Sequence, residues 1–186
     1  LDRQNLVLDF EKLGFEGASL RHLTAALAEP HGILLVTGPT GSGKTLAAFL
    51  HSIDRLMTSP APADRQRRCR VLYISPLKAL AVDIARNLEA PVKEMGLKVR
   101  LETRTGDTSA HKRQRQKVQP PDILLTTPEQ LALLLAAREA PSMFGDLRCV
   151  VLDELHALAP SKRGDLLALD LARLATKAGS EGEAFR

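Results

Sequence analysis

The stretch ILLVTGPTGSGKTLAAFLHSIDRLM, residues 33–57, joins a short apolar run, a glycine-rich loop and a helical pattern without a break. The apolar run at 33–37 predicts a buried strand, and residues 46–57 have apolar side chains at helical spacing. Between them, the loop matches the pattern G-x-x-x-x-G-K-[ST] at Gly38, Gly43, Lys44 and Thr45. Glycines let such a loop curl around a phosphate, with its N–H groups pointing inward at the positive end of the following helix. The stretch therefore predicts a phosphate-binding loop between a strand and a helix.

A nucleoside triphosphate with Mg²⁺ is the ligand expected for this loop. Lys44 would reach the β- and γ-phosphates, and the Thr45 hydroxyl would take one position on Mg²⁺. An ordinary glycine turn is the alternative, but Lys44 and Thr45 would then stand in their places by chance. We expect the whole loop to contact the nucleotide, through Gly38, Pro39, Thr40, Gly41, Ser42, Gly43, Lys44 and Thr45.

The composition is that of one globular domain. Of the 186 residues, 44% are apolar and 26% are charged, and the net charge is only +4. No run approaches the roughly 20 apolar residues of a membrane span and no signal peptide is visible, so we expect a cytoplasmic protein without a membrane partner. Cys69 and Cys149 have no His or Cys at ligand spacing and are expected to be reduced and structural. The chain begins with Leu1 rather than Met, which predicts a fragment of a longer protein.

Strand and helix patterns alternate from residue 71 onward. The predicted strands are Val71–Ser75, Val99–Thr105, Asp122–Thr126 and Cys149–Leu152, and the predicted helices are 77–90 (ending at Pro91), His111–Val118, Glu129–Glu139 and Leu166–Ala178. The helix His111–Val118 is polar and basic and is expected to be exposed. The alternation predicts an α/β fold with a mostly parallel sheet, helices on both faces and ligands at the carboxyl ends of the strands.

A loop, Thr58–Arg70, precedes the alternating region. Its clustered arginines favour a solvated surface over a nucleic-acid patch, and they are Arg65, Arg67, Arg68 and Arg70. The chain has five Phe, one Tyr and no Trp, so base stacking on aromatic side chains is not expected to dominate any nucleic-acid contact.

The second chemical element is VVLDELH, residues 150–156, an apolar strand that ends in two adjacent carboxylates. In a phosphate-loop NTPase, Asp153 would hold Mg²⁺, usually through water, and Glu154 would orient the attacking water. Such a pair alone is commonly a solvated strand end, and the phosphate loop upstream is what favours the functional interpretation. The predicted catalytic residues are therefore Lys44, Asp153 and Glu154, with Thr45 and Asp153 as metal ligands. The spacing leaves open whether His156 is functional or structural.

Successive motifs now resemble those of a known family. They are PTGSGKTLAAFL, YISPLKALAVDIARNL, TRTGDT, PPDILLTTPEQLALLL, VVLDELHAL and SKRGDLLAL. They look like the first RecA-like domain of superfamily 2 DExH-box helicases, most of all the large helicase-related (Lhr) family in its branch associated with a DNA ligase and a nuclease. The resemblance covers about residues 38–178 and implies ATP, Mg²⁺, single-stranded DNA and those repair enzymes as ligands and partners.

The resemblance also implies roles for residues outside the nucleotide site. His156 would couple the nucleotide site to the DNA, and a DNA strand would run along Pro76, Leu77, Lys78, Arg104, Gly106, Thr126, Thr127 and Pro128. Loops at strand ends offer backbone N–H groups, hydroxyls and cations that follow phosphates without reading bases. Structural alternatives exist for each segment: Pro76 ends a strand, residues 126–128 start a helix, and Gly106-Asp107 is a common turn pair.

Two parts of the chain depart from the helicase pattern. Residues 1–45 resemble the lead-in of type II secretion and type IV pilus assembly ATPases, so the chain reads as a hybrid and adenine specificity is unsupported. The other departure is the end at Arg186, before the S-A-T segment and the second RecA-like domain with its arginine finger. Such a finger is worth about 10³ to 10⁵ in turnover, so we expect poor hydrolysis by this chain alone. The expected organisation is a lead-in at 1–32, the ATP-binding domain at 33–178 and a flexible tail at 179–186.

The sequence leaves two alternatives to the helicase interpretation. One is a fragment of a secretion or pilus ATPase, which would form hexamers and act on protein partners, but the acid pair followed by His156 speaks against it. The other is a hybrid fragment that binds nucleotide without catalysis.

Overall fold

The computed structural model of the chain describes residues 32–36, 49, 52–53, 56–59, 62–94, 96–158 and 161–178, with the backbone alone at 32–36, 90–91, 156 and 176–178. Some predictions lie outside these residues, namely the loop 38–45, the lead-in before residue 32 and the tail 179–186.

A parallel sheet of five strands forms the centre of the described part, in the order β1-β5-β2-β4-β3. The strands are β1 Gly32–Val36, β2 Val71–Ile74, β3 Leu101–Arg104, β4 Ile123–Thr126 and β5 Cys149–Asp153. Because all run in one direction, their carboxyl ends meet at one edge of the sheet. The prediction of a mostly parallel α/β sheet is confirmed, and the strand ends differ from the predicted ones by at most two residues, as is usual for element boundaries.

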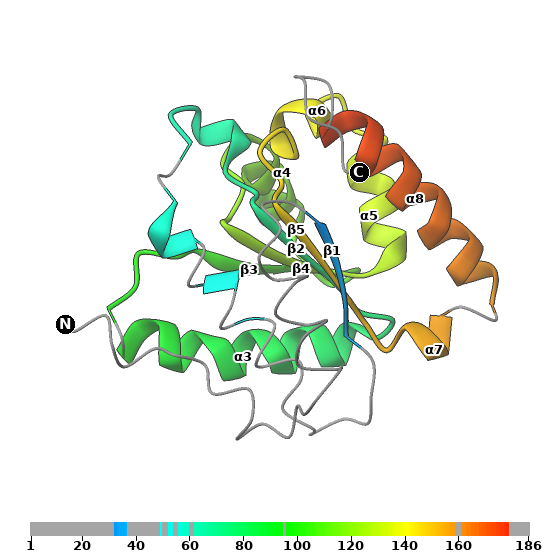
Figure 1. The fold of residues 1–186 in the computed structure, drawn as a ribbon, viewed down its shortest axis with the longest axis horizontal. Coiled ribbons are helices and arrows are strands. Elements are labelled where there is room, and N and C mark those ends of the chain that lie inside the picture. The colour runs from blue at the N-terminus through cyan, green and yellow to red at the C-terminus, as the bar shows by residue number, and fades with distance from the viewer. Residues whose placement is uncertain are drawn as a thin grey trace, which may run out of the picture.

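Helices cover both faces of this sheet, as predicted. The helices are the 3-10 helix η2 Arg65–Arg67 and the α-helices α3 Lys78–Glu94, α4 Ala110–Val118, α5 Pro128–Leu135, α6 Ala140–Met143, α7 Leu155–Leu158 and α8 Lys162–Ala178, and residues 49, 52–53 and 56–58 are also helical. Figure 1 shows α3 along one face of the sheet and α5 with α8 on the other.

The core divides into two clusters because alternate residues of a strand point to opposite faces. In β2, Val71 and Tyr73 pack with α3 and with Phe49, whereas Leu72 and Ile74 pack with α5, α6 and α8. Phe49, like Ile53 and Leu56, is helical and buried, which confirms the predicted apolar stripe at these positions.

Several helix ends differ from the predicted ones. The helix predicted over Glu129–Glu139 stops at Leu135, and a short helix, α6, follows at Ala140–Met143 with a proline in its first turn. Tight backbone bonds from Ala137 N–H to Leu134 O and from Ala140 N–H to Ala137 O close the intervening turn. Four-residue helices such as α6 and α7 are too short to leave a periodic signal in the sequence.

Two long helices extend beyond their predicted limits. The helix predicted to end at Pro91 continues to Glu94, because buried Val92 anchors its last turn in the core below α3. The helix predicted from Leu166 begins at Lys162. Its first turn is polar, so the apolar periodicity on which the prediction depended does not mark it.

The arginines of the loop 58–70 are not the solvated surface that we expected. Arg70 is only 5% exposed, and its guanidinium lies 3.0 Å from the fully buried carboxylate of Asp122. Arg68 reaches the same carboxylate at 2.9 Å, and Arg67 pairs with Asp146 at 3.3 Å. Only Arg65 is exposed as predicted. These ion pairs were invisible in the sequence because Asp122 lies more than fifty residues away.

One polar side chain of the basic helix α4 is buried, although we expected this helix to be exposed. Gln116 is fully buried, and its amide donates to Glu102 at 2.9 Å and to the Thr103 carbonyl at 3.1 Å. Both cysteines are free, as predicted. Among the described helices, none combines the length and the apolar composition of a membrane-spanning segment.

Candidate nucleotide and nucleic-acid site

The candidate site lies along the edge of the sheet where the strands end. β1 ends at Val36, whose partner in the adjacent strand is Asp153. Val36 is thus the last described residue before the glycine-rich segment of the sequence, and it lies beside Asp153. The loop residues themselves lie outside the described residues, so their contacts stay predictions: Gly38, Pro39, Thr40, Gly41, Ser42, Gly43, Lys44 and Thr45.

Asp153 is the last residue of β5 and is only 6% exposed. Its Oδ1 accepts a hydrogen bond from the Glu154 backbone N–H at 2.9 Å, and its Oδ2 accepts one from the Tyr73 hydroxyl. A carboxylate has about four lone-pair sites, so these two bonds leave acceptor capacity for a hydrated cation. The fold thus holds this carboxylate in one orientation at the sheet edge.

Glu154 adopts a left-handed backbone conformation, with φ of 50°. For a residue other than glycine such a conformation costs about 1–3 kcal/mol, and such residues are enriched at active sites and ligand-binding sites. Helix α7 begins directly after it, and the Ala157 N–H donates to the Glu154 carbonyl at 2.9 Å. Asp153 is buried and Glu154 is half-buried, so the two adjacent carboxylates lie in different environments.

Tyr73 is a member of this site that the sequence reasoning missed. Burial raises the pKa of Tyr73 above its ordinary value, and the hydrogen bond to Asp153 with the charges of Asp153 and Glu154 raises it further. The hydroxyl therefore keeps its proton at neutral pH and donates to the carboxylate. In the sequence Tyr73 stood in an apolar strand, and only the adjacency of β2 and β5 reveals its partner.

The acid pair fits a magnesium site that a bound nucleotide would complete. In ATP sites Mg²⁺ takes one or two carboxylates, and its other ligands are phosphate oxygens and water. Within the described residues, no group of three or more His, Cys, Asp or Glu side chains could hold a metal by itself. Asp153, already oriented by two hydrogen bonds, is the carboxylate that would hold the ion, with Thr45 as the second predicted ligand.

The predicted nucleic-acid segments lie side by side, because they follow the adjacent strands β2, β4 and β3. The Ser75 N–H donates to the Thr126 carbonyl at 3.0 Å, and the Thr126 hydroxyl donates to the Arg104 carbonyl at 2.9 Å. These bonds tie the three strand ends into one continuous row.

The members of this row differ in accessibility. Leu77 is 61% exposed, and Lys78 and Gly106 are also exposed. The others are buried, namely Pro76, Arg104, Thr126, Thr127 and Pro128. Their direct contact with DNA stays a prediction; in the structure, Thr126 and Arg104 join the strand ends through hydrogen bonds.

Arg163 is a second residue that the sequence reasoning missed. From the start of α8 it donates to the Pro76 carbonyl at 2.7 Å and pairs with the Glu129 carboxylate at 2.5 Å. Partial burial opposes ionisation of Glu129, but the hydrogen bond from Arg163 holds the pKa of that carboxyl below its ordinary value. Arg163 thus joins the loop after β2 to the start of α5, which follows β4.

Two cations lie near the loop after β3. Arg113 donates to the Gly106 and Thr105 carbonyls, and its own carbonyl accepts from Arg104 at 3.1 Å. Lys78 pairs with Asp107. His156 lies in α7, where only its backbone is described, so the question of its role stays open.

A parallel sheet with a phosphate-loop sequence after β1 and an acid pair at the end of adjacent β5 defines a RecA-like phosphate-loop NTPase domain. The model of the DEAD/DEAH box helicase family matches residues 21–182, and the chain belongs to this family.

Within the family, the chain is similar to Lhr helicases. It is 47% identical over 154 residues to the Lhr helicase/uracil glycosylase of Escherichia coli, covering 75% of this chain and 10% of that protein. It is 44% identical over 156 residues to ATP-dependent helicase Lhr-Core protein 2 of Thermococcus barophilus, covering 78% and 18%. The chain therefore spans less than a fifth of these relatives. The predicted resemblance to Lhr helicases is confirmed.

A solved structure agrees with the sequence similarity. Mycobacterium smegmatis helicase Lhr, bound to single-stranded DNA and AMP-PNP, superimposes with a TM-score of 0.65 at 40% identity, over 88% of this chain and 23% of that one. The predicted RecA-like fold is confirmed.

A shorter similarity points to the other predicted relative. Over 59 residues the chain is 51% identical to type II secretion system protein E of Xanthomonas campestris, which covers 32% of this chain and 10% of that protein. This match is minor beside the helicase match. That residues 1–45 were joined to a helicase domain stays a prediction.

Proposed function

We propose that this chain is the ATP-binding first motor domain of an Lhr-like DNA helicase. In the full-length protein it would couple the binding and hydrolysis of ATP, with Mg²⁺, to translocation along single-stranded DNA. Lys44 would hold the phosphates, Asp153 and Thr45 the metal, and Glu154 the attacking water.

The observation that supports this function is the shared edge of the sheet. The nucleotide motifs follow β1 and β5, and the predicted DNA segments follow β2, β4 and β3, which continue the same sheet. Binding or release of the nucleotide therefore acts on strands that are hydrogen-bonded to the strands before the predicted DNA segments, and the reverse holds for DNA. This arrangement suits a domain in which nucleotide and DNA influence each other.

Other parts of the full-length protein would complete the activity. A second RecA-like domain would supply the arginine finger and close on the nucleotide, so the present chain is expected to hydrolyse ATP slowly. A DNA ligase and a nuclease are the protein partners that the resemblance implies, and a cytoplasmic location goes with them.

Equilibrium binding of a fluorescent ATP analogue, with and without Mg²⁺, tests the proposal. Saturable binding that Mg²⁺ strengthens is expected, and Lys44→Ala is expected to abolish it because the variant lacks the cation that faces the phosphates. Binding of the same affinity in Lys44→Ala would refute the assignment of the loop. A hexamer in light scattering without affinity for single-stranded DNA would favour the secretion ATPase instead.

A further inference from the structure

We propose that Tyr73 is a positioning residue for Asp153, whose carboxylate it holds in the orientation that receives hydrated Mg²⁺. This inference rests on the proposed nucleotide site. It assigns a role in that site to a strand residue outside the phosphate loop and the acid pair.

The register of the sheet makes the contact possible. Tyr73 in β2 is the partner of Val151 in β5, and Asp153 follows two residues later on the same face. A side chain as long as tyrosine can reach this diagonal neighbour. The Tyr73 hydroxyl accordingly donates to Oδ2 of Asp153.

Both oxygens of Asp153 are held in this arrangement. Oδ1 accepts the Glu154 backbone N–H, and Oδ2 accepts the Tyr73 hydroxyl. With one donor on each oxygen, the plane of the carboxylate is fixed. Without the hydroxyl, Oδ2 would lose this donor, and rotation about the Cβ–Cγ bond would turn the remaining lone pairs away from the metal.

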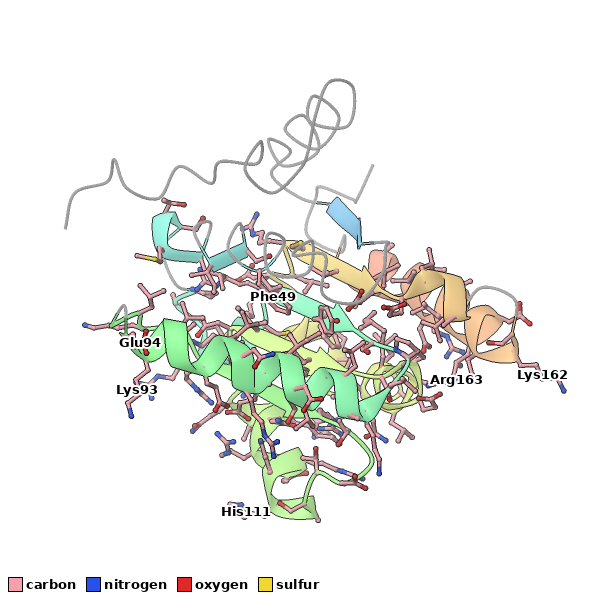
Figure 2. The ribbon with its side chains drawn as sticks, turned by 90° about the horizontal axis from the view of Figure 1, so that it is seen from below. Phe49, Lys93, Glu94, His111, Lys162 and Arg163 are labelled. Carbon is pink, nitrogen blue, oxygen red and sulfur yellow. The ribbon has the colours of Figure 1, made fainter. Side chains whose placement is uncertain are left out.

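The other end of the contact is fixed by Phe49. Tyr73 is fully buried, and its ring centroid lies 5.0 Å from that of Phe49, with the rings tilted by 36°. Phe49 stands four residues after Thr45 on the helix that follows the phosphate loop. Figure 2 shows Phe49 in the interior of the fold. One tyrosine therefore contacts both the helix behind the phosphate loop and the predicted metal ligand.

The variant Tyr73→Phe removes the hydroxyl and keeps the ring against Phe49. We expect its affinity for a fluorescent ATP analogue without Mg²⁺ to equal that of the parent chain. The Mg²⁺ concentration that half-maximally strengthens binding is expected to rise roughly 10-fold, as for other groups that orient a metal ligand. Ser142→Ala, which removes a hydroxyl bonded to the Glu139 carbonyl on α6, is the control and should leave both values unchanged.

The outcomes separate this inference from the proposed function. If the parent chain shows no Mg²⁺-dependent binding, the proposed nucleotide site fails. If the parent binds as expected and Tyr73→Phe has the same Mg²⁺ dependence, only the role of Tyr73 is overturned.

A second measurement keeps the inference testable if Tyr73→Phe does not fold. Tyr73 is the only tyrosine of the chain, so a chain labelled with ¹³C at tyrosine Cζ gives a single NMR signal. Addition of Mg²⁺ to the chain already saturated with ATP analogue should shift this signal, because the hydroxyl shares its acceptor with the metal shell. An unmoved signal, while binding strengthens, would overturn the inference.

Discussion

Lys78 Nζ lies 2.7 Å from Asp107 Oδ2, and this exposed ion pair joins the start of α3, the helix that follows β2, to the loop after β3, across the end of β4. The two side chains are 63% and 72% exposed. In the proposed function Lys78 contacts a DNA phosphate, so Asp107 competes with the DNA for the ammonium group.

Removal of this competitor should strengthen DNA binding. Exposed ion pairs are worth about 0–1 kcal/mol, so Asp107→Asn is expected to raise affinity for single-stranded DNA by about two- to fivefold at low salt. Fluorescence anisotropy with a labelled oligonucleotide measures this affinity. Glu89→Gln, the same loss of charge on the exposed side of α3, is the control. An equal gain in both variants would mean that only net charge matters.

The contacts of Arg163 with the Pro76 carbonyl and with Glu129 give a second prediction. Arg163→Ala removes the bonds to the Pro76 carbonyl and to Glu129, which frees the loop after β2 from the start of α5. We expect weaker binding of single-stranded DNA and unchanged binding of the ATP analogue. Lys162→Ala is the matched control, since Figure 2 shows Lys162 beside Arg163 but extending away from the fold. If the two variants bind DNA alike, Arg163 does not shape the DNA site.

Glu154 gives a prediction about chemistry. Glu154→Gln keeps the side-chain size but removes the carboxylate that would polarise the attacking water. Binding of Mg-ATP should persist while any phosphate release by the chain is lost, as measured by analogue binding and a phosphate assay. Glu94→Gln, at the opposite end of the molecule from Arg163 in Figure 2, is the control and should leave both Mg-ATP binding and phosphate release unchanged. Equal turnover in parent and Glu154→Gln would refute the role of Glu154.

Asp170 gives a prediction about stability. It is fully buried, neither of its carboxylate oxygens has a hydrogen-bond partner among the described residues, and Arg173 lies 3.9 Å away. Burial raises the pKa of Asp170, and the charge of Arg173 only partly offsets this. Between pH 3.8, the ordinary pKa of an aspartate, and the raised pKa of folded Asp170, the folded chain binds more protons than the unfolded chain. The free energy of unfolding therefore falls as pH rises through this window and stays lower above it.

Asp170→Asn removes this ionisation. We expect the variant to melt at a higher temperature than the parent at pH 7, by at least about 2 °C, and the difference to shrink as pH falls toward 4. Thermal unfolding followed by circular dichroism measures it, with Asp165→Asn on the exposed side of the same helix as control. A difference that stays constant with pH would show that the charge of Asp170 is not the cause.

The sequence alone determined the kind of fold and the chemical class of the site. Apolar runs of four or five residues alternate with helical stripes, and such local periodicity predicts a parallel α/β sheet without further information. The acid pair at residues 153 and 154 was also readable, because its evidence is a short motif at the end of an apolar strand. These features depend on residues that are close together in the chain.

Only the tertiary structure decided which side chains meet. Tyr73 contacts Asp153 because β2 lies beside β5, and Arg163 reaches Pro76 because α8 folds back along the sheet. The same holds for Arg70, predicted to be solvated but buried against Asp122. Each pair is separated by more than fifty residues. Burial and pairing at such distances depend on strand order and register, which a local pattern does not encode.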